Sequence, residues 1–301
     1  MSLNGTVVDL SAGDYRATIA AAGATLCSLT WQGRDLVAPF DPAAGLGLAY
    51  QGRTLAPWPN RVTDGRYSFG GADYELPRTE HATGASLHGM ACWTTWQVRR
   101  RSCDAVEFAL DLPGMPGYPF DVRLTASYTL SEDGLAAEVT ACNEGASAAP
   151  VGLSTHPYLT VGSPLEDCTF TLPGERVLTV DAAMRPVAVV GVEEAGLDFR
   201  RPTPMAGRRV DHAFTGLPAS WVARLQGPDG FAVEISSDAP WAQAFSADLP
   251  GLDRGCLAVE PMTCGPDAFN REDVSLDPGE GADLLPDLLG HEGHEGVQQL
   301  E

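Results

Sequence analysis

The sequence predicts an all-β protein, a large antiparallel β-sandwich, and three observations lead to this fold class. Apolar and polar side chains alternate along several segments, which is typical of strands with one buried face. Turns rich in Gly, Pro and Asp separate these segments. No segment of about twelve residues carries apolar side chains at the 3.6-residue spacing of a helix. Because no linker or internal repeat divides the chain, we expect one domain over residues 1–290.

In chain order, the first expected hairpin joins residues 67–69 to 74–76 across a Gly-Gly turn. The longest alternating segments follow, at 106–112, 120–130 and 135–141, and the last two are joined by a Ser-Glu-Asp-Gly turn. Glycine in such turns adopts positive φ at little steric cost. These segments predict consecutive antiparallel strands.

The C-terminal part is less regular. A second hairpin is expected between residues 221–225 and 231–235, around Gly-Pro-Asp-Gly. Residues 281–289 read poorly as a strand because a proline interrupts them, so either the last strand is irregular or the sheet edge there is less stable. Residues 291–301 are polar and repetitive, and we expect a disordered tail.

Composition excludes several function classes. The formal net charge is −21, with 40 acidic and 19 basic residues, so nucleic acid and anionic membranes are poor partners. The seven cysteines form no CxxC pair, which favours reduced thiols over a disulfide framework. No apolar stretch reaches the roughly 18 residues of a membrane span, and no signal peptide precedes the first strand. We therefore expect a cytoplasmic protein.

Glu260 is the first candidate for chemistry, because it closes the apolar segment 257–259 just before a proline. Burying a carboxylate there is costly, and apolar surroundings raise its pKa toward the range where it accepts a proton near neutral pH. The alternative is a solvated Glu at a strand end. His88 precedes Gly89, and His156 precedes a proline, so both imidazoles lie in tight turns. A base with two possible proton donors suggests acid/base chemistry without a cofactor.

Three further polar residues occupy constrained positions. Arg61 follows Pro-Trp-Pro-Asn and could hydrogen-bond a polyol, or it could be a structural arginine stacked on Trp58. Asp211 could accept hydroxyl groups or merely cap a turn. Gln243 lies between Trp241 and Phe245 and could offer its amide to hydroxyls, whereas the aromatic residues fit a core strand equally well.

Other site classes are disfavoured. His88, His156, Asp211 and Glu260 are metal-ligand types, but no short H-x-H or HExxH spacing occurs, so we expect no metal. No Gly-rich phosphate loop opens a helix, and no G-x-S-x-G turn is present.

Taken in order, these motifs resemble those of the aldose 1-epimerase (galactose mutarotase) family, in particular a bacterial subgroup. The resemblance runs from Gly23 to Glu280. The matching elements are Pro59-Asn60-Arg61, Leu87-His88-Gly89, His156-Pro157-Tyr158, Asp211 with Phe214, Gln243, and Val259-Glu260-Pro261. Each is short, but their shared order is specific.

The resemblance implies a supersandwich of the galactose-mutarotase type and an isomerase that interconverts the anomers of a hexose. Glu260 would be the general base at the C1 hydroxyl, and His156 the acid at the ring oxygen. The substrate-binding residues would be Asn60, Arg61, His88, Tyr158, Asp211 and Gln243. No cofactor is implied. The expected partner is a small sugar, and the expected assembly is a monomer or a homodimer.

Two alternatives stay open. The pairs Arg200-Arg201 and Arg208-Arg209 could face a sulfonate or phosphate on C6, which would favour sulfoquinovose or a hexose 6-phosphate. The favoured interpretation is that they are solvated loop arginines on an acidic surface. A carbohydrate-binding or sensing protein without turnover is the other alternative, although binding alone needs no matched acid and base.

Overall fold

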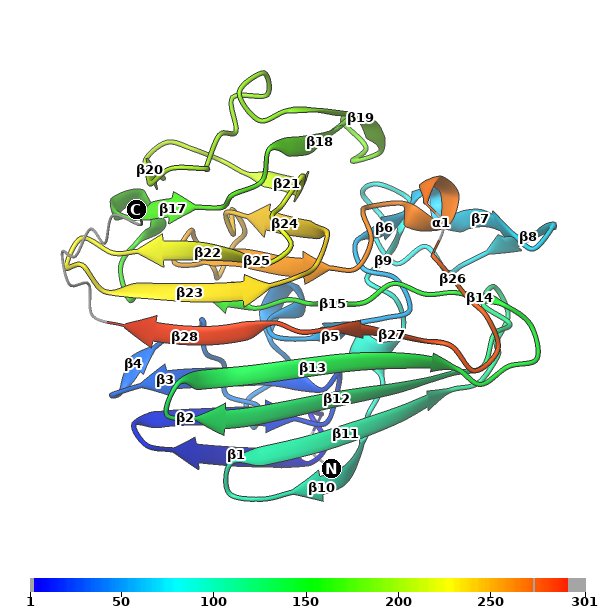
Figure 1. Cartoon of the computed structure of the whole chain (residues 1–301), viewed down its shortest axis with the longest axis horizontal. Coiled ribbons are helices and arrows are strands. Elements are labelled where there is room, and N and C mark those ends of the chain that lie inside the picture. The colour runs from blue at the N-terminus through cyan, green and yellow to red at the C-terminus, as the bar shows by residue number, and fades with distance from the viewer. Residues whose placement is uncertain (1–2, 273, 292–301) are drawn as a thin grey trace.

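Strands make up most of the structure, a computed structural model that describes residues 3–272 and 274–291 (Figure 1). The largest sheet has ten strands, and β27 (Gly281–Leu284) joins it beside β13. The other nine strands, in spatial order, are β10 (Gln97–Arg101), β11 (Ala105–Leu112), β12 (Val122–Ser131), β13 (Gly134–Asn143), β28 (Asp287–His291), β23 (Ala232–Ser237), β22 (Trp221–Gln226), β17 (Thr169–Thr171) and β20 (Thr203–Pro204).

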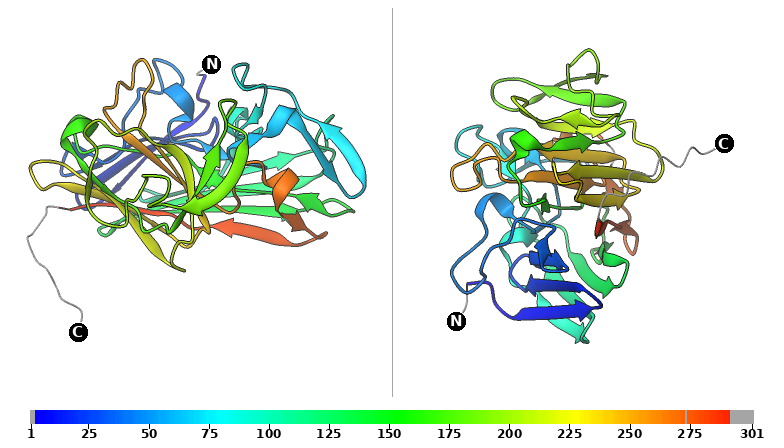
Figure 2. Two further views of the ribbon diagram at one scale, coloured as in Figure 1. Left: turned by 90° about the horizontal axis from the view of Figure 1, so that it is seen from above. Right: turned by 90° about the vertical axis from the view of Figure 1, so that its left-hand side faces the viewer.

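Two further sheets form the second layer of the molecule, as the views of Figure 2 show. The eight-stranded sheet has β16 (Tyr158–Leu159) beside β25 and otherwise runs β19 (Pro186–Gly191), β18 (Arg176–Val180), β21 (Asp211–Thr215), β24 (Trp241–Phe245), β25 (Leu257–Met262), β15 (Ser154–Thr155) and β5 (Thr54–Leu55). The four-stranded sheet consists of β1 (Val7–Ala12), β2 (Tyr15–Ala20), β3 (Thr25–Trp31) and β4 (Arg34–Asp35).

Short elements connect the sheets. The paired strands are β6 (Arg61–Val62) with β9 (Ser86–Leu87), β7 (Arg66–Phe69) with β8 (Ala72–Glu75), and β14 (Ala149–Pro150) with β26 (Ser275–Leu276). The helices are α1 (Ala268–Arg271) and the 3₁₀ turns η1 (Leu48–Tyr50), η2 (Thr63–Gly65), η3 (Ala91–Trp93) and η4 (Leu165–Asp167). No helix of the described residues is long and apolar enough to cross a membrane.

The alternating segments form the strands that the sequence predicts. Along β12 the even-numbered residues from Val122 to Leu130 are buried, while most of the residues between them are partly or fully exposed. Strands β1 and β2 pack against β11 and β12, so their apolar faces share one core. Every pair of described strands is antiparallel, which confirms the predicted all-β antiparallel class. The single domain predicted for residues 1–290 stays a prediction.

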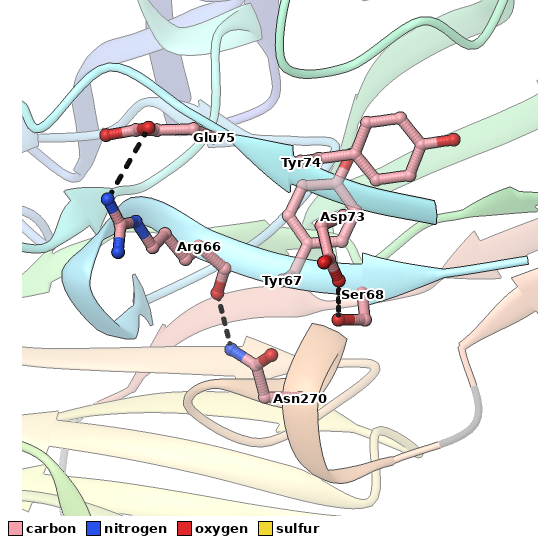
Figure 3. A pocket seen from close by; sticks show the side chains of 7 residues that line it. All are labelled: Arg66, Tyr67, Ser68, Asp73, Tyr74, Glu75 and Asn270. Atoms are coloured by element: carbon pink, nitrogen blue, oxygen red, sulfur yellow. Dashed lines mark hydrogen bonds and ion pairs between the residues drawn. The ribbon is translucent and has the colours of Figure 1, made fainter. Parts of the chain in front are cut away.

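Both predicted hairpins are present. β22 and β23 pair from Trp221 opposite Ser237 to Gln226 opposite Ala232. In the β7–β8 hairpin the Tyr67 and Tyr74 rings stack at 5.0 Å, and the hairpin and α1 border a surface groove of about 470 Å³ (Figure 3). Asn270 of α1 donates to the Arg66 carbonyl at 2.9 Å and so fixes α1 against β7.

The expectation of a poor last strand is corrected by the structure. β27 and β28 are both strands, and β28 lies between β13 and β23, in the interior of the sheet and not at its edge (Figure 1). The buried positions are Leu284, Pro286, Leu288 and Gly290. Every second residue is therefore buried, as in a strand with one buried face. The sequence conceals this alternation because proline and glycine occupy two of the buried positions. His291 ends β28, and residues 292–301 of the predicted tail lie outside the described residues.

Candidate active site

All eight residues that the sequence analysis selects line one cavity of about 410 Å³. Adjacent strands supply three of them: Gln243 on β24 lies directly opposite Glu260 on β25, and Asp211 begins β21. Short strands and the loops beside them supply the other five: Arg61 begins β6 and Tyr158 begins β16, while Asn60, His88 and His156 lie in adjoining loops. The strands therefore bring together residues that are far apart in the sequence.

Glu260 and His156 form the buried centre of the cavity. Glu260 Oε1 and His156 Nε2 are 3.3 Å apart, and the two side chains are only 3% and 5% exposed. Within the described residues, Glu260 Oε2 and His156 Nδ1 have no hydrogen-bond partner. Buried polar atoms are usually paired, so unpaired ones that face a cavity are expected where a ligand binds.

The pKa values of this pair are displaced in opposite directions. Burial raises the pKa of the Glu260 carboxyl well above its ordinary value, and the nearby charge of Asp211 adds to the rise. Burial lowers the pKa of His156 to about 3. Both shifts reflect the cost of holding a charge away from water. Over a wide pH range the pair therefore holds one proton between its two members.

His88 is fixed in one tautomer. The backbone N–H of Asn60 donates to His88 Nδ1 at 3.1 Å, so the proton of the neutral ring lies on Nε2. Burial lowers the pKa of His88 well below its ordinary value, followed by the effect of neighbouring His156, so the ring stays neutral. His88 thus offers a hydrogen-bond donor to a ligand.

The geometry around His88 requires the glycine that follows it. A Cβ on Gly89 would lie 2.1 Å from the Ala56 carbonyl oxygen, and the φ of Gly89 is +70°. The Ala56 carbonyl accepts the N–H groups of Met90 and Ala91. Gly89 is therefore packed closely against the protein's own main chain at Ala56.

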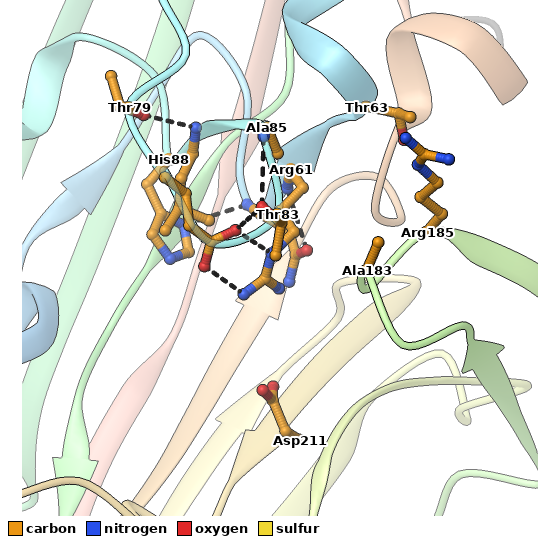
Figure 4. A network of polar contacts seen from close by, with 12 residues as sticks. Arg61, Thr63, Thr79, Thr83, Ala85, His88, Ala183, Arg185 and Asp211 are labelled. Atoms are coloured by element: carbon orange, nitrogen blue, oxygen red, sulfur yellow. Dashed lines mark hydrogen bonds and ion pairs between the residues drawn. The ribbon is translucent and has the colours of Figure 1, made fainter.

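Arg61 lies in a network that the sequence did not reveal (Figure 4). Its Nε and one terminal nitrogen donate to the two carboxylate oxygens of Glu80 at 2.7 and 2.8 Å, and Thr83 Oγ1 also donates to Glu80. Burial alone would lower the pKa of Arg61, but the pairing with Glu80 raises it. The Arg61 carbonyl accepts the N–H of Asp267 at 2.8 Å. Hydrogen bonds therefore fix both the main chain and the side chain of Arg61.

Asp211 and Gln243 meet on the opposite side of the cavity. Gln243 Nε2 donates to Asp211 Oδ1 at 2.6 Å, and Gln243 Oε1 has no partner among the described residues. Burial raises the pKa of Asp211, against the influence of Arg61. Figure 4 shows the Asp211 carboxylate directed toward the Arg61 network. An amide and a carboxylate in this arrangement can hold hydroxyl groups.

Aromatic rings flank His156. The Tyr158 ring stacks on it at 4.8 Å, and the Tyr50 ring lies parallel to it at 6.4 Å. The Tyr158 hydroxyl donates to the Ala49 carbonyl at 2.9 Å. These rings exclude water from one side of the acid/base pair, which contributes to the pKa shifts.

Several lining residues were not selected from the sequence. They are Ala49, Tyr50, Glu80, Leu87, Phe245 and Leu249. Leu87 and Phe245 belong to motifs that were selected for a neighbouring residue. Glu80 lies in a loop with no periodicity, and Tyr50 lies in a turn at φ +62°, so neither carries a sequence signal.

A metal site remains disfavoured by the donor set. His88, His156 and Glu260 place one possible ligand atom each within 4.8 Å of one another. The Nδ1 atom of His88 already accepts the Asn60 amide, so its Nε2 carries a proton and donates instead of ligating. This leaves two ligands for a site that normally needs three or more protein atoms.

The arginine pairs do not reach the cavity, which corrects the suggestion that they face the substrate. Arg200 pairs with Glu193 and Asp198, and Arg209 approaches Asp248 at 3.3 Å. Arg201 and Arg208 are exposed and line no part of the cavity. The solvated-loop alternative is therefore the correct one for these residues.

Comparison with known families gives a match across most of the chain. A family model described as aldose 1-epimerase matches residues 6–283. Uncharacterized protein YihR of Escherichia coli (strain K12) is 38% identical over 273 residues, covering 90% of this chain and 88% of that protein. A galactose mutarotase of Mus musculus is 29% identical over 266 residues, covering 77% of this chain and 76% of that protein.

Solved structures share the fold. A GalM/aldose epimerase homologue from C. elegans superposes with a TM-score of 0.86 at 22% identity, covering 96% of this chain and 99% of that one. A galactose 1-epimerase from Lactobacillus acidophilus NCFM gives a TM-score of 0.83 at 19% identity, covering 97% and 96%. The predicted galactose-mutarotase type of sandwich is thereby confirmed.

Proposed function

The chain belongs to the aldose 1-epimerase family, whose members are isomerases, and from this premise we propose that it interconverts the α and β anomers of a neutral hexose. The observation that carries the proposal is the buried Glu260–His156 pair, with 3.3 Å between Oε1 and Nε2. Ring opening needs one proton removed and another delivered, at two different oxygens of the sugar.

Before the sugar binds, the single proton of the pair lies on Glu260. In the proposed reaction this proton first passes to His156; Glu260 then removes the proton of the C1 hydroxyl while His156 donates its proton to the ring oxygen O5. The C1–O5 bond breaks, which leaves an aldehyde at C1 and a hydroxyl at C5. After rotation about the C1–C2 bond, the C5 hydroxyl attacks the other face of the aldehyde. His156 then recovers its proton from O5 and Glu260 returns its proton to O1, so both groups regain the states from which ring opening began.

The other cavity residues hold the sugar in this scheme. His88 donates from Nε2, and Asn60 orients that imidazole through its backbone amide. Asp211 and Gln243 bind hydroxyls, and Arg61 donates from the opposite wall. Tyr158 supports His156 by stacking. Acid and base groups each typically contribute about 10²–10⁴-fold to a rate, which is ample for a reaction that already proceeds unaided.

A neutral sugar fits the charges of the cavity better than an anionic one. Among the described lining residues, Arg61 is the only arginine, and Glu80 takes up two of its donors. Asp211 and Glu260 add two carboxyl groups to the lining of the cavity. A sulfonate or phosphate would meet no unpaired cation there and would lie close to acidic groups.

The direct test is anomer exchange measured by NMR at equilibrium for glucose, galactose, sulfoquinovose and glucose 6-phosphate, with buffer alone as the reference. We expect exchange above the buffer rate for a neutral hexose. Fastest exchange with an anionic sugar would overturn the neutral assignment and retain the reaction. Binding without faster exchange, in folded protein, would point to a sensing role.

The pH dependence should report the Glu260–His156 pair. Turnover requires one proton on the pair, so kcat/KM falls when a second proton adds and when the last one leaves. Because burial lowers the pKa of His156 to about 3 and raises that of Glu260 well above its ordinary value, we expect a bell with an unusually wide plateau. Exchange rates corrected for buffer, measured where circular dichroism shows folded protein, check this. An acid limb near the ordinary imidazole pKa of 6.5, in place of one far below it, would contradict it.

Glu80 should act as a positioning residue for Arg61. Replacing Glu80 with glutamine removes the charge from a bidentate pair, and charge-assisted hydrogen bonds contribute about 1.5–3 kcal/mol. We expect KM for a neutral hexose to rise about tenfold or more, with a smaller effect on kcat, and the relative rate with anionic sugars to rise as Arg61 is released.

Glu75→Gln is the matched control for this variant. Glu75 also contacts arginines, Arg66 and Arg78, but on the exposed β8 strand and outside the sugar cavity. It should leave KM unchanged. Equal KM values for Glu80→Gln and the wild type would show that Arg61 needs no partner.

A further inference from the structure

An exposed tryptophan lies next to the aromatic wall of the cavity. Trp93, the last residue of η3, is 55% exposed, which is unusual for so large an apolar side chain. The Arg53 guanidinium lies 4.3 Å from the centre of its ring. Arg53 is itself only 3% exposed and donates to the Cys92 carbonyl at 2.6 Å. One face of Trp93 is therefore covered by a fixed cation, while more than half of the side chain is open to solvent.

Tyr50 connects Trp93 to the cavity. The Tyr50 ring, which lines the cavity, contacts the Trp93 ring edge-on at 5.3 Å and the His88 ring at 4.6 Å. Ala49 and Tyr50 both adopt left-handed backbone conformations, at φ 44° and 62°. Such strain persists only where surrounding contacts enforce it, and it is concentrated at functional sites.

The same segment is bonded to the proposed acid. The His156 carbonyl accepts the N–H of Gly52 at 2.9 Å, and the His156 N–H donates to the Arg53 carbonyl at 3.0 Å. The turn that presents Tyr50, the cation beneath Trp93 and the imidazole of His156 are therefore one connected unit. Trp93 is thus held in a fixed position relative to His156.

On this basis we propose that Trp93 forms a second sugar subsite, which stacks against a pyranose ring linked to C6 of the reacting hexose. The inference rests on the proposed function, because it uses the position of His156 at O5. The carbon next to O5 is C5, which carries C6, so a substituent on C6 leaves the cavity on the side of His156. Tyr50 and Trp93 continue the wall on that side.

The aromatic surface formed by Tyr50 and Trp93 favours an uncharged pyranose ring. The guanidinium of Arg53 is covered by Trp93 and can contact no anion. Leu249, which lines the cavity, is 41% exposed and adds apolar surface to the cavity itself. The C–H face of a pyranose stacks on such surface and leaves its hydroxyls in water. The substrate class is therefore a reducing disaccharide with a 1→6 linkage, in addition to the free hexose.

The test compares anomer exchange on glucose, gentiobiose (a 1→6-linked glucose disaccharide) and cellobiose (its 1→4-linked counterpart). Wild-type protein, Trp93→Ala and Trp93→Phe are measured, with Val187→Ala as a control at an exposed apolar residue outside the cavity. In Trp93→Ala we expect kcat/KM for gentiobiose relative to glucose to fall about tenfold, with an intermediate value in Trp93→Phe. The ratio for cellobiose should not change.

An unchanged gentiobiose-to-glucose ratio in Trp93→Ala would overturn the subsite, and so would an equal fall for cellobiose. If glucose exchanges no faster than in buffer, it is the proposed function that fails. The subsite is then decided by calorimetric titration of gentiobiose and glucose: a gentiobiose preference lost in Trp93→Ala supports it, and equal binding to both proteins refutes it.

Discussion

Replacing Glu260 with glutamine is expected to lower kcat for anomer exchange by about 10²–10⁴-fold, with little change in KM. The amide has the size of the carboxyl and can still receive hydrogen bonds, but it cannot take the proton of the C1 hydroxyl. Because glutamine carries no charge to desolvate, the free energy of unfolding should stay equal or rise. Exchange rates over a range of sugar concentrations, together with a thermal melt, measure both effects.

Glu138→Gln is the matched control for Glu260→Gln. Glu138 lies on β13 and faces solvent, so the same chemical change there removes a charge without reaching the cavity. It should leave kcat unchanged. A near-normal kcat in folded Glu260→Gln would remove the base from the scheme and with it the proposed mechanism.

Replacing His156 with asparagine should lower kcat by a similar factor, about 10²–10⁴-fold, because His156, 3.3 Å from Glu260, supplies the proton to O5 in the proposed reaction. The double variant with Glu260→Gln should lose little more than either single variant. Groups that act as one unit have strongly non-additive effects.

His81→Asn controls for the loss of an imidazole. His81 is exposed and does not line the cavity, so its replacement should leave exchange rates unchanged. Multiplicative losses in the double variant would contradict a paired acid and base, and would indicate two groups that act separately. A thermal melt of His156→Asn separates a catalytic effect from loss of the stacking with Tyr158.

The sequence was most informative where the spacing of apolar residues matches the alternation of buried and exposed residues along a strand. Strands β11, β12 and β13 could be predicted because each buries alternate residues and ends at a polar turn. The eight site residues could be identified because each lies in a short motif whose order matches a known family. Their convergence in one cavity follows from strand pairing, such as Gln243 opposite Glu260, which no local pattern specifies.

Other features have no local signal. The pairing of Arg61 with Glu80 joins residues 19 positions apart across an irregular loop, so no helix or strand spacing indicates it. Tyr50 reaches the cavity through a left-handed turn without glycine, which sequence patterns do not predict. The arginine pairs illustrate the reverse case, in which charges that could have faced a substrate are exposed and partly paired with local carboxylates.

The place of β28 between β13 and β23 constrains the order of folding. The hairpins β12–β13 and β22–β23 consist of contacts between near neighbours and can form early. Their union requires Leu288 to reach both Leu135 and Ile235, which are far away along the chain, and such non-local pairing is slow. Until then β13 and β23 each expose an unpaired edge. Residues 281–291 therefore govern the risk of aggregation during synthesis, although none of the described side chains among them lines the cavity of Glu260 and His156.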